Sequence, residues 1–350
     1  MYLSLTDFVN QILSQPKLLI STLLTLGVIF VNGWTDAPNS IATCIATRAL
    51  SPKKAIALSA VFNFLGVLVM TLVNAKVAMT VKNMVNFSGD TDKAFTALTT
   101  GLISIIIWAV AAWCFAIPTS ESHALIAGLS GSAMALQNGF GGINTHEWMT
   151  VIYGLILSTV LGFTLGFLTT KLTSIVLYTT DRGKTRSFFK NAQIIGGAAM
   201  SFMHGAQDGQ KFIGVMLLSV SLSNGTDIAE NVITPIWMMI LCALMITLGT
   251  SVGGYKIIKS VGMDMVKLER YQGFCADLSG AICLLLSSTF GVPVSTTHTK
   301  TTAIMGVGAA KKLTDINFAI VKEMLSAWIL TFPCCMLIGY ITTKLFMIFI

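Results

Sequence analysis

Long uncharged stretches of apolar residues recur along the whole of this 350-residue chain. One of them, ALTTGLISIIIWAVAAWCFAI, is apolar on every face of a helix and has about the ~20 residues that cross the hydrocarbon core of a bilayer. Such stretches lie near residues 16–34, 54–75, 96–117, 122–138, 150–177, 192–222, 231–253, 272–291, 301–310 and 319–350. Membrane-spanning β-strands would instead alternate apolar and polar positions in segments of about ten residues. The sequence therefore predicts an all-α, polytopic membrane protein.

The composition and the charge support a lipid environment. Only 11% of the residues are charged and the mean hydropathy is +0.78, whereas soluble domains carry about 25% charged residues. The formal net charge of +7 comes largely from basic residues in short connecting segments, such as 171–190 and 256–270. Lys and Arg gather on the cytoplasmic side of membrane proteins, where they face anionic lipid headgroups. We therefore expect the lipid bilayer as a partner, no nucleic acid, and a multi-pass location in a bacterial inner or plasma membrane.

The first apolar segment and the cysteines have simple interpretations. No basic stretch precedes the first segment and no small-residue cleavage site follows it, so we expect a retained helix rather than a signal peptide. The seven cysteines form no CxxC or CxxH spacing, which argues against a disulfide framework or a zinc site. They are predicted to be small core residues, at Cys44, Cys114, Cys242, Cys275, Cys283, Cys334 and Cys335.

Two motifs occur twice, in the same order. Asp36 in NGWTDAPN and Asp208 in HGAQDGQK are 172 residues apart, and IPTSESHALIAGLSGSA recurs as VPVSTTHTKTTAIMGVGAA at an offset of 175. This pattern indicates an internal duplication. It predicts a first transmembrane repeat at 1–180, a basic connecting loop at 181–190 and a second transmembrane repeat at 191–350.

Each half contains an apolar run that is interrupted by a proline followed by hydroxyl residues. The interruptions begin at Pro118 and Pro293, with no charged loop between the flanking apolar runs. Such a pattern is typical of a re-entrant helical hairpin, whose non-helical tip must be satisfied by protein or by a water-filled cavity. Paired broken segments in two repeats also indicate where a transporter binds its substrate. We therefore expect two inverted repeats, each with a re-entrant hairpin whose tip lies near the middle of the membrane.

The hairpin tips have the chemistry of an anion site. A helix that begins after a proline turn has free backbone amides and a positive dipole end, which together favour a small oxyanion. Hydroxyl groups at both tips would add donors. Alternatively, Ser and Thr at these positions simply cap the helices, but the repetition favours binding. The candidate ligands for this anion are Thr119, Ser120, Ser122, Ser295, Thr296 and Thr297.

The repeated acids need a partner within the membrane. At helical spacing Asp36 shares a face with Asn39, and Asp208 shares a face with Lys211. A charge in the bilayer costs about 2.5–3.5 kcal/mol on insertion scales, and a carboxylate beside an anion site would repel the substrate. A cation between them resolves this conflict, and it can be Na⁺, a divalent metal or a proton. The alternatives are an ion pair of Asp208 with Lys211 and a pairing of Asp36 with the distant Lys300.

Further polar residues lie in or near the tips. His123 and His298 can donate to a substrate or move protons, or fix the hairpin tip by hydrogen bonding. Glu121 lies in the first tip, where the second tip has Thr296, so the tips are not chemically equivalent.

A third acid, Asp277, has no acidic counterpart in the first half. The equivalent position is Leu102. Asp277 is predicted to be either a cation-coupling site or a partner for Lys300, and the sequence does not rank these two roles.

Together these motifs resemble the inorganic phosphate transporter family called PiT, over essentially the whole chain. NGWTDAPNS resembles its first GANDVANA-like motif, HGAQDGQKFIG its second, HGANDGQK-like motif, and a hairpin tip follows each. The resemblance implies two inverted repeats that bind phosphate between the tips and the acid-motif helices, coupled to Na⁺ or H⁺. Trp34, Thr35 and Gln207 depart from the family pattern. Asn39 retains the later asparagine of the motif, while Lys211 replaces it in the second half and would attract an oxyanion directly.

The expected function is secondary active transport of inorganic phosphate, coupled to Na⁺ or H⁺ or carrying a metal-phosphate complex. No Walker motif indicates ATP driving, and no cofactor is expected beyond the transported ion and a divalent metal bound with phosphate. The alternatives are a sulfate permease, an anion channel and an intramembrane enzyme; the repeated motif argues against a single catalytic centre. The chain is also compatible with a homo-oligomer. Asn39 and Lys211 join the predicted phosphate ligands, and the predicted cation-coupling residues are Asp36, Asp208, Asn39 and Asp277.

Overall fold

The computed structural model describes residues 4–115, 119–180, 182–225, 234–254 and 258–349, and within these ranges it is a bundle of helices without a named strand. The elements in chain order are α1 (Leu5–Ser14), α2 (Pro16–Thr35), α3 (Pro38–Ala46), α4 (Pro52–Val73), α5 (Lys76–Asn83), α6 (Thr91–Cys114), α7 (Glu121–Leu136), η1 (Phe140–Gly142), α8 (Thr145–Val176), α9 (Arg182–Asn224), α10 (Ile236–Val252), η2 (Ile258–Asp264), α12 (Arg270–Thr289), α13 (Thr296–Lys311), η3 (Leu313–Asp315) and α14 (Phe318–Met347).

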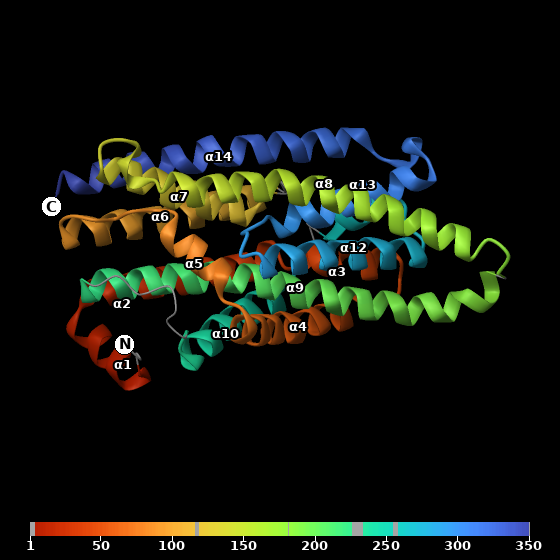
Figure 1. Cartoon of the computed structure of the whole chain (residues 1–350), viewed down its shortest axis with the longest axis horizontal. Coiled ribbons are helices and arrows are strands. Elements are labelled where there is room, and N and C mark those ends of the chain that lie inside the picture. Colours follow the sequence, from red (N-terminus) through yellow and green to blue (C-terminus); the bar gives the residue numbers. More distant parts are fainter. Residues whose placement is uncertain (1–3, 116–118, 181, 226–233, 255–257, 350) are drawn as a thin grey trace.

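Several of these helices are long and apolar enough to cross a membrane. Five candidate spans are found among the described residues, at Pro16–Ala46, Pro52–Val73, Thr91–Cys114, Thr145–Val176 and Phe318–Met347. The longest helices, α8, α9 and α14, run along the long axis of the bundle, and α1 lies at the same end of the bundle as the last turns of α14 (Figure 1). The prediction of an all-α, multi-pass membrane protein is confirmed.

Two helical hairpins enter the bundle from opposite ends. The pair α6 and α7 lies at the end that holds α1, and the pair α12 and α13 lies toward the other end (Figure 1). Their tips meet inside the bundle, where the Oγ atoms of Ser120 and Ser295 are 2.7 Å apart. Pro118 lies outside the described residues, whereas Pro293 lies in the second tip. The arrangement supports an inverted relation between two repeats of 1–180 and 191–350, which itself stays a prediction.

The two acid motifs differ in backbone structure. Asp36 caps the end of α2, and α3 begins at Pro38, because proline has no N–H to continue the helical hydrogen bonds. Asp208 lies within α9, a continuous helix of 43 residues. The prediction of a basic connecting loop at 181–190 is wrong for its described part, because α9 already begins at Arg182; Asp181 lies outside the described residues.

Glycines bring the two acid-motif helices against their neighbours. A Cβ on Gly205 of α9 would lie 2.2 Å from the carbonyl oxygen of Asn63 in α4, and a Cβ on Gly249 of α10 would lie 2.1 Å from the carbonyl oxygen of Phe30 in α2. Small residues at such crossings let helix backbones approach closely in membranes. The contact of α4 with α9 thus fixes the helix that carries Asp208.

We expect the Gly205→Ala variant to be markedly less stable, because its new methyl group overlaps backbone rather than a movable side chain. Strain of this kind in a packed interior costs about 1–3 kcal/mol, and the measurement is the melting temperature of the purified protein in detergent. The matched control is Gly27→Ala in α2, whose new Cβ would lie 3.6 Å from Ile106. Equal melting temperatures for the two variants would contradict this close approach.

Candidate functional site

The two hairpin tips present the N-termini of α7 and α13 to each other. Ser120 Oγ accepts a hydrogen bond from the backbone N–H of His123 at 3.3 Å, and Ser295 Oγ accepts one from that of His298 at 3.1 Å. Ser120 and Ser295 therefore cap these helices, as the alternative interpretation held, while the favoured role in anion binding stays a prediction. Because the capping hydroxyls also contact each other, two helix N-termini with their partial positive charge converge on one buried place.

Asp36 is surrounded by hydrogen-bond donors from its own motif and from the second tip. Its carboxylate accepts from Asn39 Nδ2 at 2.7 Å, from Thr296 Oγ1 at 3.1 Å and from Thr297 Oγ1. The interruption between α2 and α3 places the carboxylate at a helix break, where α13 can reach it. The first acid motif and the second hairpin tip thus form one buried cluster.

Asp208 faces Asp36 across Thr296. The Thr296 hydroxyl lies 3.3 Å from Asp208 Oδ2 as well as within reach of Asp36, although it has a single proton to donate. Asp208 also accepts from Asn32 Nδ2 at 3.2 Å and lies 3.3 Å from His204 Nε2. The ligand atoms of Asp36, His204 and Asp208 lie within 4.8 Å of one another, an arrangement that could hold a metal ion. Two facing buried carboxylates are strongly destabilised unless a cation or a proton lies with them.

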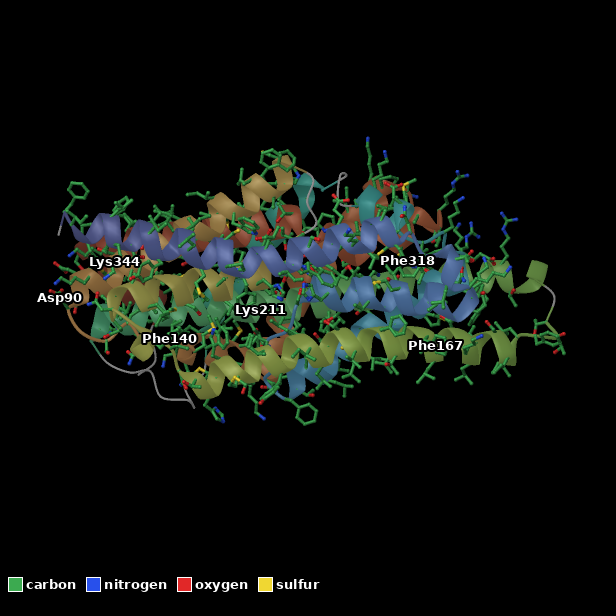
Figure 2. The ribbon with its side chains drawn as sticks, turned by 90° about the horizontal axis from the view of Figure 1, so that it is seen from above. Asp90, Phe140, Phe167, Lys211, Phe318 and Lys344 are labelled. Atoms are coloured by element: carbon green, nitrogen blue, oxygen red, sulfur yellow. The ribbon has the colours of Figure 1, made fainter. Side chains whose placement is uncertain are left out.

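Lys211 joins the second acid motif to both tips. Its Nζ lies 2.7 Å from Asp208 Oδ1, 2.6 Å from Ser122 Oγ and 2.6 Å from the carbonyl oxygen of Val294, which uses all three ammonium protons. Figure 2 shows Lys211 near the middle of the bundle along its long axis, and its side chain is buried. The ion pair with Asp208, which the sequence analysis gave as the alternative to cation coupling, is present, and the same ammonium group contacts the hydroxyl of the first tip.

The structure brings most of the predicted site residues into this central site, which we define by Asp36, Asn39, Ser120, Ser122, Asp208, Lys211, Ser295, Thr296 and Thr297. Thr119 is buried beside the first tip. The roles predicted for these residues in binding phosphate and a cation stay predictions.

Asp277 does not reach the central site. Its carboxylate pairs with Lys300 and accepts from Thr43 Oγ1 at 2.7 Å and from Gln193 Nε2 at 2.5 Å. Of the two roles left open by the sequence, partner for Lys300 is thus the one that the contacts show. The alternative that Lys300 pairs with Asp36 is wrong, because α13 directs Lys300 to the hairpin arm α12.

The two tip histidines contact each other and the last helix. Their ring centroids are 4.3 Å apart, and the His298 ring stacks on Trp328 of α14 at 3.6 Å. Glu121 accepts a hydrogen bond from Thr35 Oγ1 at 3.0 Å. These ring contacts hold the two tip histidines against each other and against α14, while the hydrogen-bonding role that the sequence predicts for them stays a prediction.

Several residues of the site were not singled out from the sequence. His204 had a signal, because it lies one helical turn before Asp208 and so shares its face. For Asn32 no sequence signal indicated this contact, because Asn32 belongs to the first acid motif and yet donates to the acid of the second. A contact between segments 176 residues apart leaves no local pattern.

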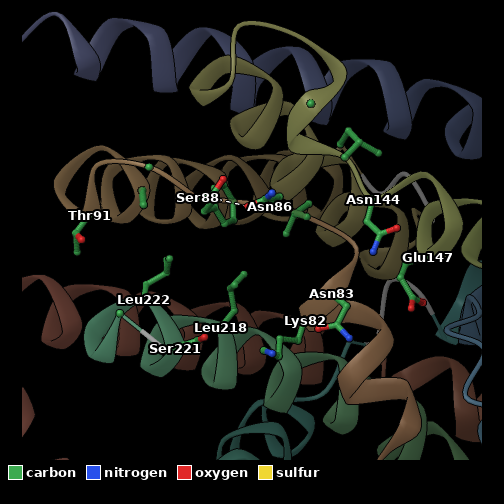
Figure 3. A pocket seen from close by; sticks show the side chains of 17 residues that line it. Lys82, Asn83, Asn86, Ser88, Thr91, Asn144, Glu147, Leu218, Ser221 and Leu222 are labelled. Atoms are coloured by element: carbon green, nitrogen blue, oxygen red, sulfur yellow. Dashed lines mark hydrogen bonds between the residues drawn. The ribbon is translucent and has the colours of Figure 1, made fainter. Parts of the chain in front are cut away.

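Cavities open at both ends of the bundle, while the central site is closed between them. A cavity of about 820 Å³ is lined by polar side chains of α5, the following loop and the start of α8, including Asn83, Asn86 and Asn144 (Figure 3). A second, of about 710 Å³, lies at the other end among Thr47, Arg48 and residues of the α8–α9 connection. An occluded polar site with a cavity at each end suits alternating access of a solute.

The fold and the site define a polytopic membrane transporter built around paired hairpin tips. Residues 32–339 match the model of the phosphate transporter family, and the chain belongs to that family. The resemblance to PiT transporters is confirmed, and so is the prediction of a phosphate transporter rather than an enzyme.

Relatives and a solved structure agree with this assignment. A protein of Bacillus subtilis (strain 168), described as a probable low-affinity inorganic phosphate transporter, is 35% identical over 93% of this chain and 96% of its own length. A protein of Rhizobium meliloti (strain 1021) with the same description is 35% identical over 89% of this chain and 90% of its own. A solved structure described as "The sodium-dependent phosphate transporter" has a TM-score of 0.86 at 22% identity and covers 96% of this chain and 100% of its own. At that identity the structural likeness shows the fold.

Proposed function

We propose that this protein is a secondary active transporter of the cell membrane that binds inorganic phosphate at the central site and moves it together with Na⁺ or a proton. The observation that carries the proposal is the position of Lys211. Its ammonium group contacts both hairpin tips while it pairs with Asp208. A phosphate that takes over the Ser122 contact would meet a positive charge, hydroxyl donors and two helix N-termini.

The facing carboxylates favour phosphate over sulfate. Phosphate near neutral pH carries a hydroxyl that can donate a hydrogen bond, and sulfate does not. Asp36 and Asp208 are acceptors within the same cluster as the tip hydroxyls. A carboxylate attracts the hydroxyl of phosphate and repels the fully deprotonated oxygens of sulfate, so the central site is suited to phosphate.

The same carboxylates provide the coupling site. Asp36, His204 and Asp208 present ligand atoms close together, and a cation or proton there offsets their mutual repulsion and their repulsion of phosphate. The transporter of similar fold is described as sodium-dependent, which favours Na⁺ as the coupling cation. Lys211 already supplies one positive charge beside Asp208. A divalent metal that enters together with phosphate would use the same oxygens.

The proposal predicts saturable uptake of radiolabelled phosphate into proteoliposomes that contain the purified protein. Uptake should be concentrative when an imposed Na⁺ gradient or an imposed proton gradient is applied, each tested separately, and sulfate in excess should compete weakly. Liposomes without protein are the control. Absence of phosphate uptake under every gradient would refute the proposed function, and equal competition by sulfate would refute the selectivity.

A further inference from the structure

A second buried cluster of charged and polar side chains lies outside the central site. Asp277 of α12 and Lys300 of α13 form an ion pair that is fully buried. Lys300 Nζ also lies 3.2 Å from Thr43 Oγ1 and 3.5 Å from the carbonyl oxygen of Ser40. Gln193 of α9 donates to Asp277, but its Oε1 has no hydrogen-bond partner among the described residues. We call these four residues, Thr43, Gln193, Asp277 and Lys300, the lower cluster.

The lower cluster lies between the central site and the 710 Å³ cavity. Along α3, Asn39 belongs to the central site, Thr43 to the lower cluster, and Thr47 just past the helix lines the cavity. These positions are four residues apart, about 6 Å per step along one helix face. On α13, Lys300 likewise follows Thr296 of the central site by about one turn. The polar residues therefore form a continuous row from the central site to the cavity.

The cavity at the end of this row is basic. Arg48, Arg186 and Arg270 line it, together with one acid, Glu269. An anion that leaves the central site by this route would pass from Lys211 to Lys300 and then to the arginines. Successive positive charges along a path are suited to conducting an anion that must be bound weakly enough to leave.

The first half of the chain shows that packing does not require this ion pair. The positions equivalent to Asp277 and Lys300, at an offset of 175, are Leu102 and Leu125, and both are fully buried in the apolar core. Replacing a buried ion pair by apolar residues is often neutral or stabilising, because the desolvation of both charges is avoided. Ionisable residues within membrane segments instead tend to mark the path of a transported ion.

We propose that the Asp277–Lys300 pair is the gate between the central site and the basic cavity, and that Lys300 is a transient phosphate site on that path. The inference rests on the proposed function. Phosphate that moves toward the cavity displaces Asp277 from Lys300, while the hydrogen bonds from Thr43 and Gln193 hold the released carboxylate. When phosphate has passed, the pair forms again and closes the path.

The test is the double variant Asp277→Leu/Lys300→Leu, which introduces the leucines found at the equivalent positions of the first half. We expect this variant to fold with a melting temperature at or above that of the wild type and to bind phosphate in detergent with an unchanged affinity. Its uptake into proteoliposomes should fall about tenfold or more, which corresponds to a barrier raised by about 1.4 kcal/mol. Uptake at the wild-type rate by a folded double variant would overturn the gate.

The conservative variant Lys300→Arg keeps the test valid if the double variant does not fold. A guanidinium group binds a carboxylate with two parallel hydrogen bonds, so the gate should open more slowly and uptake should fall while the melting temperature is unchanged. Wild-type uptake by Lys300→Arg overturns the gate. Wild-type protein that neither binds nor takes up phosphate refutes the proposed function itself, which distinguishes the two failures.

Discussion

The Lys211→Met variant is expected to lose phosphate binding and uptake. Methionine has a similar length and no charge, so both hairpin tips lose their contact with an ammonium group. Hydrogen bonds to charged groups contribute about 1.5–3 kcal/mol each, and each 1.4 kcal/mol is a factor of about ten in affinity. We expect phosphate affinity to fall about 10-fold to 100-fold, measured by isothermal titration calorimetry, and uptake to fall with it.

A loss of stability must be separated from this loss of binding. Removing one partner of a buried ion pair costs about 3–5 kcal/mol, because the other charge stays buried and uncompensated. The double variant Lys211→Met/Asp208→Asn removes both charges, so its melting temperature should recover while its phosphate affinity stays as low as that of Lys211→Met. Lys322→Met, at an exposed lysine of α14, is the matched control with normal uptake. Wild-type affinity in a folded double variant would show that Lys211 is only a structural partner of Asp208.

The sequence predicted those features of the site that are encoded locally and repeated. The two tips were predictable because proline and hydroxyl residues interrupt an apolar run at matching positions, and their capping contacts span only three residues. The contacts that assemble the site were not predictable. Thr296 lies between Asp36 and Asp208, 260 and 88 residues away, and only the packing of the two hairpins against the acid motifs brings them together.

The basic segment at the start of α9 is helical, although its charge is typical of a connecting loop. The segment 182–190 carries four basic residues and yet is helical. Lys and Arg are good helix formers, and the segment has no proline to end a helix. In a membrane protein a charged helical turn can extend beyond the bilayer, so charge marks the membrane boundary and not the end of the helix.

Replacing Asp36 with asparagine is expected to uncouple phosphate movement from the cation. Asparagine retains one oxygen that can accept from Thr296 or Thr297, but it supplies neither the negative charge that attracts Na⁺ nor a carboxylate that takes up a proton. The variant should exchange external for internal radiolabelled phosphate and yet fail to concentrate phosphate under an imposed gradient. The change removes a buried charge from a facing pair of carboxylates, so the melting temperature should not fall.

The Asp36→Asn and Asp208→Asn variants are expected to differ in stability. Asp208 pairs with Lys211, and its replacement leaves that ammonium group unpaired in the bundle, so Asp208→Asn should lose stability whereas Asp36→Asn should not. Asp92→Asn, at an exposed acid that pairs with Lys17, is a control that keeps concentrative uptake. Concentrative uptake at the wild-type level in Asp36→Asn would exclude this carboxylate from coupling. If exchange is lost together with concentrative uptake, Asp36 is needed for binding phosphate itself and not for coupling alone.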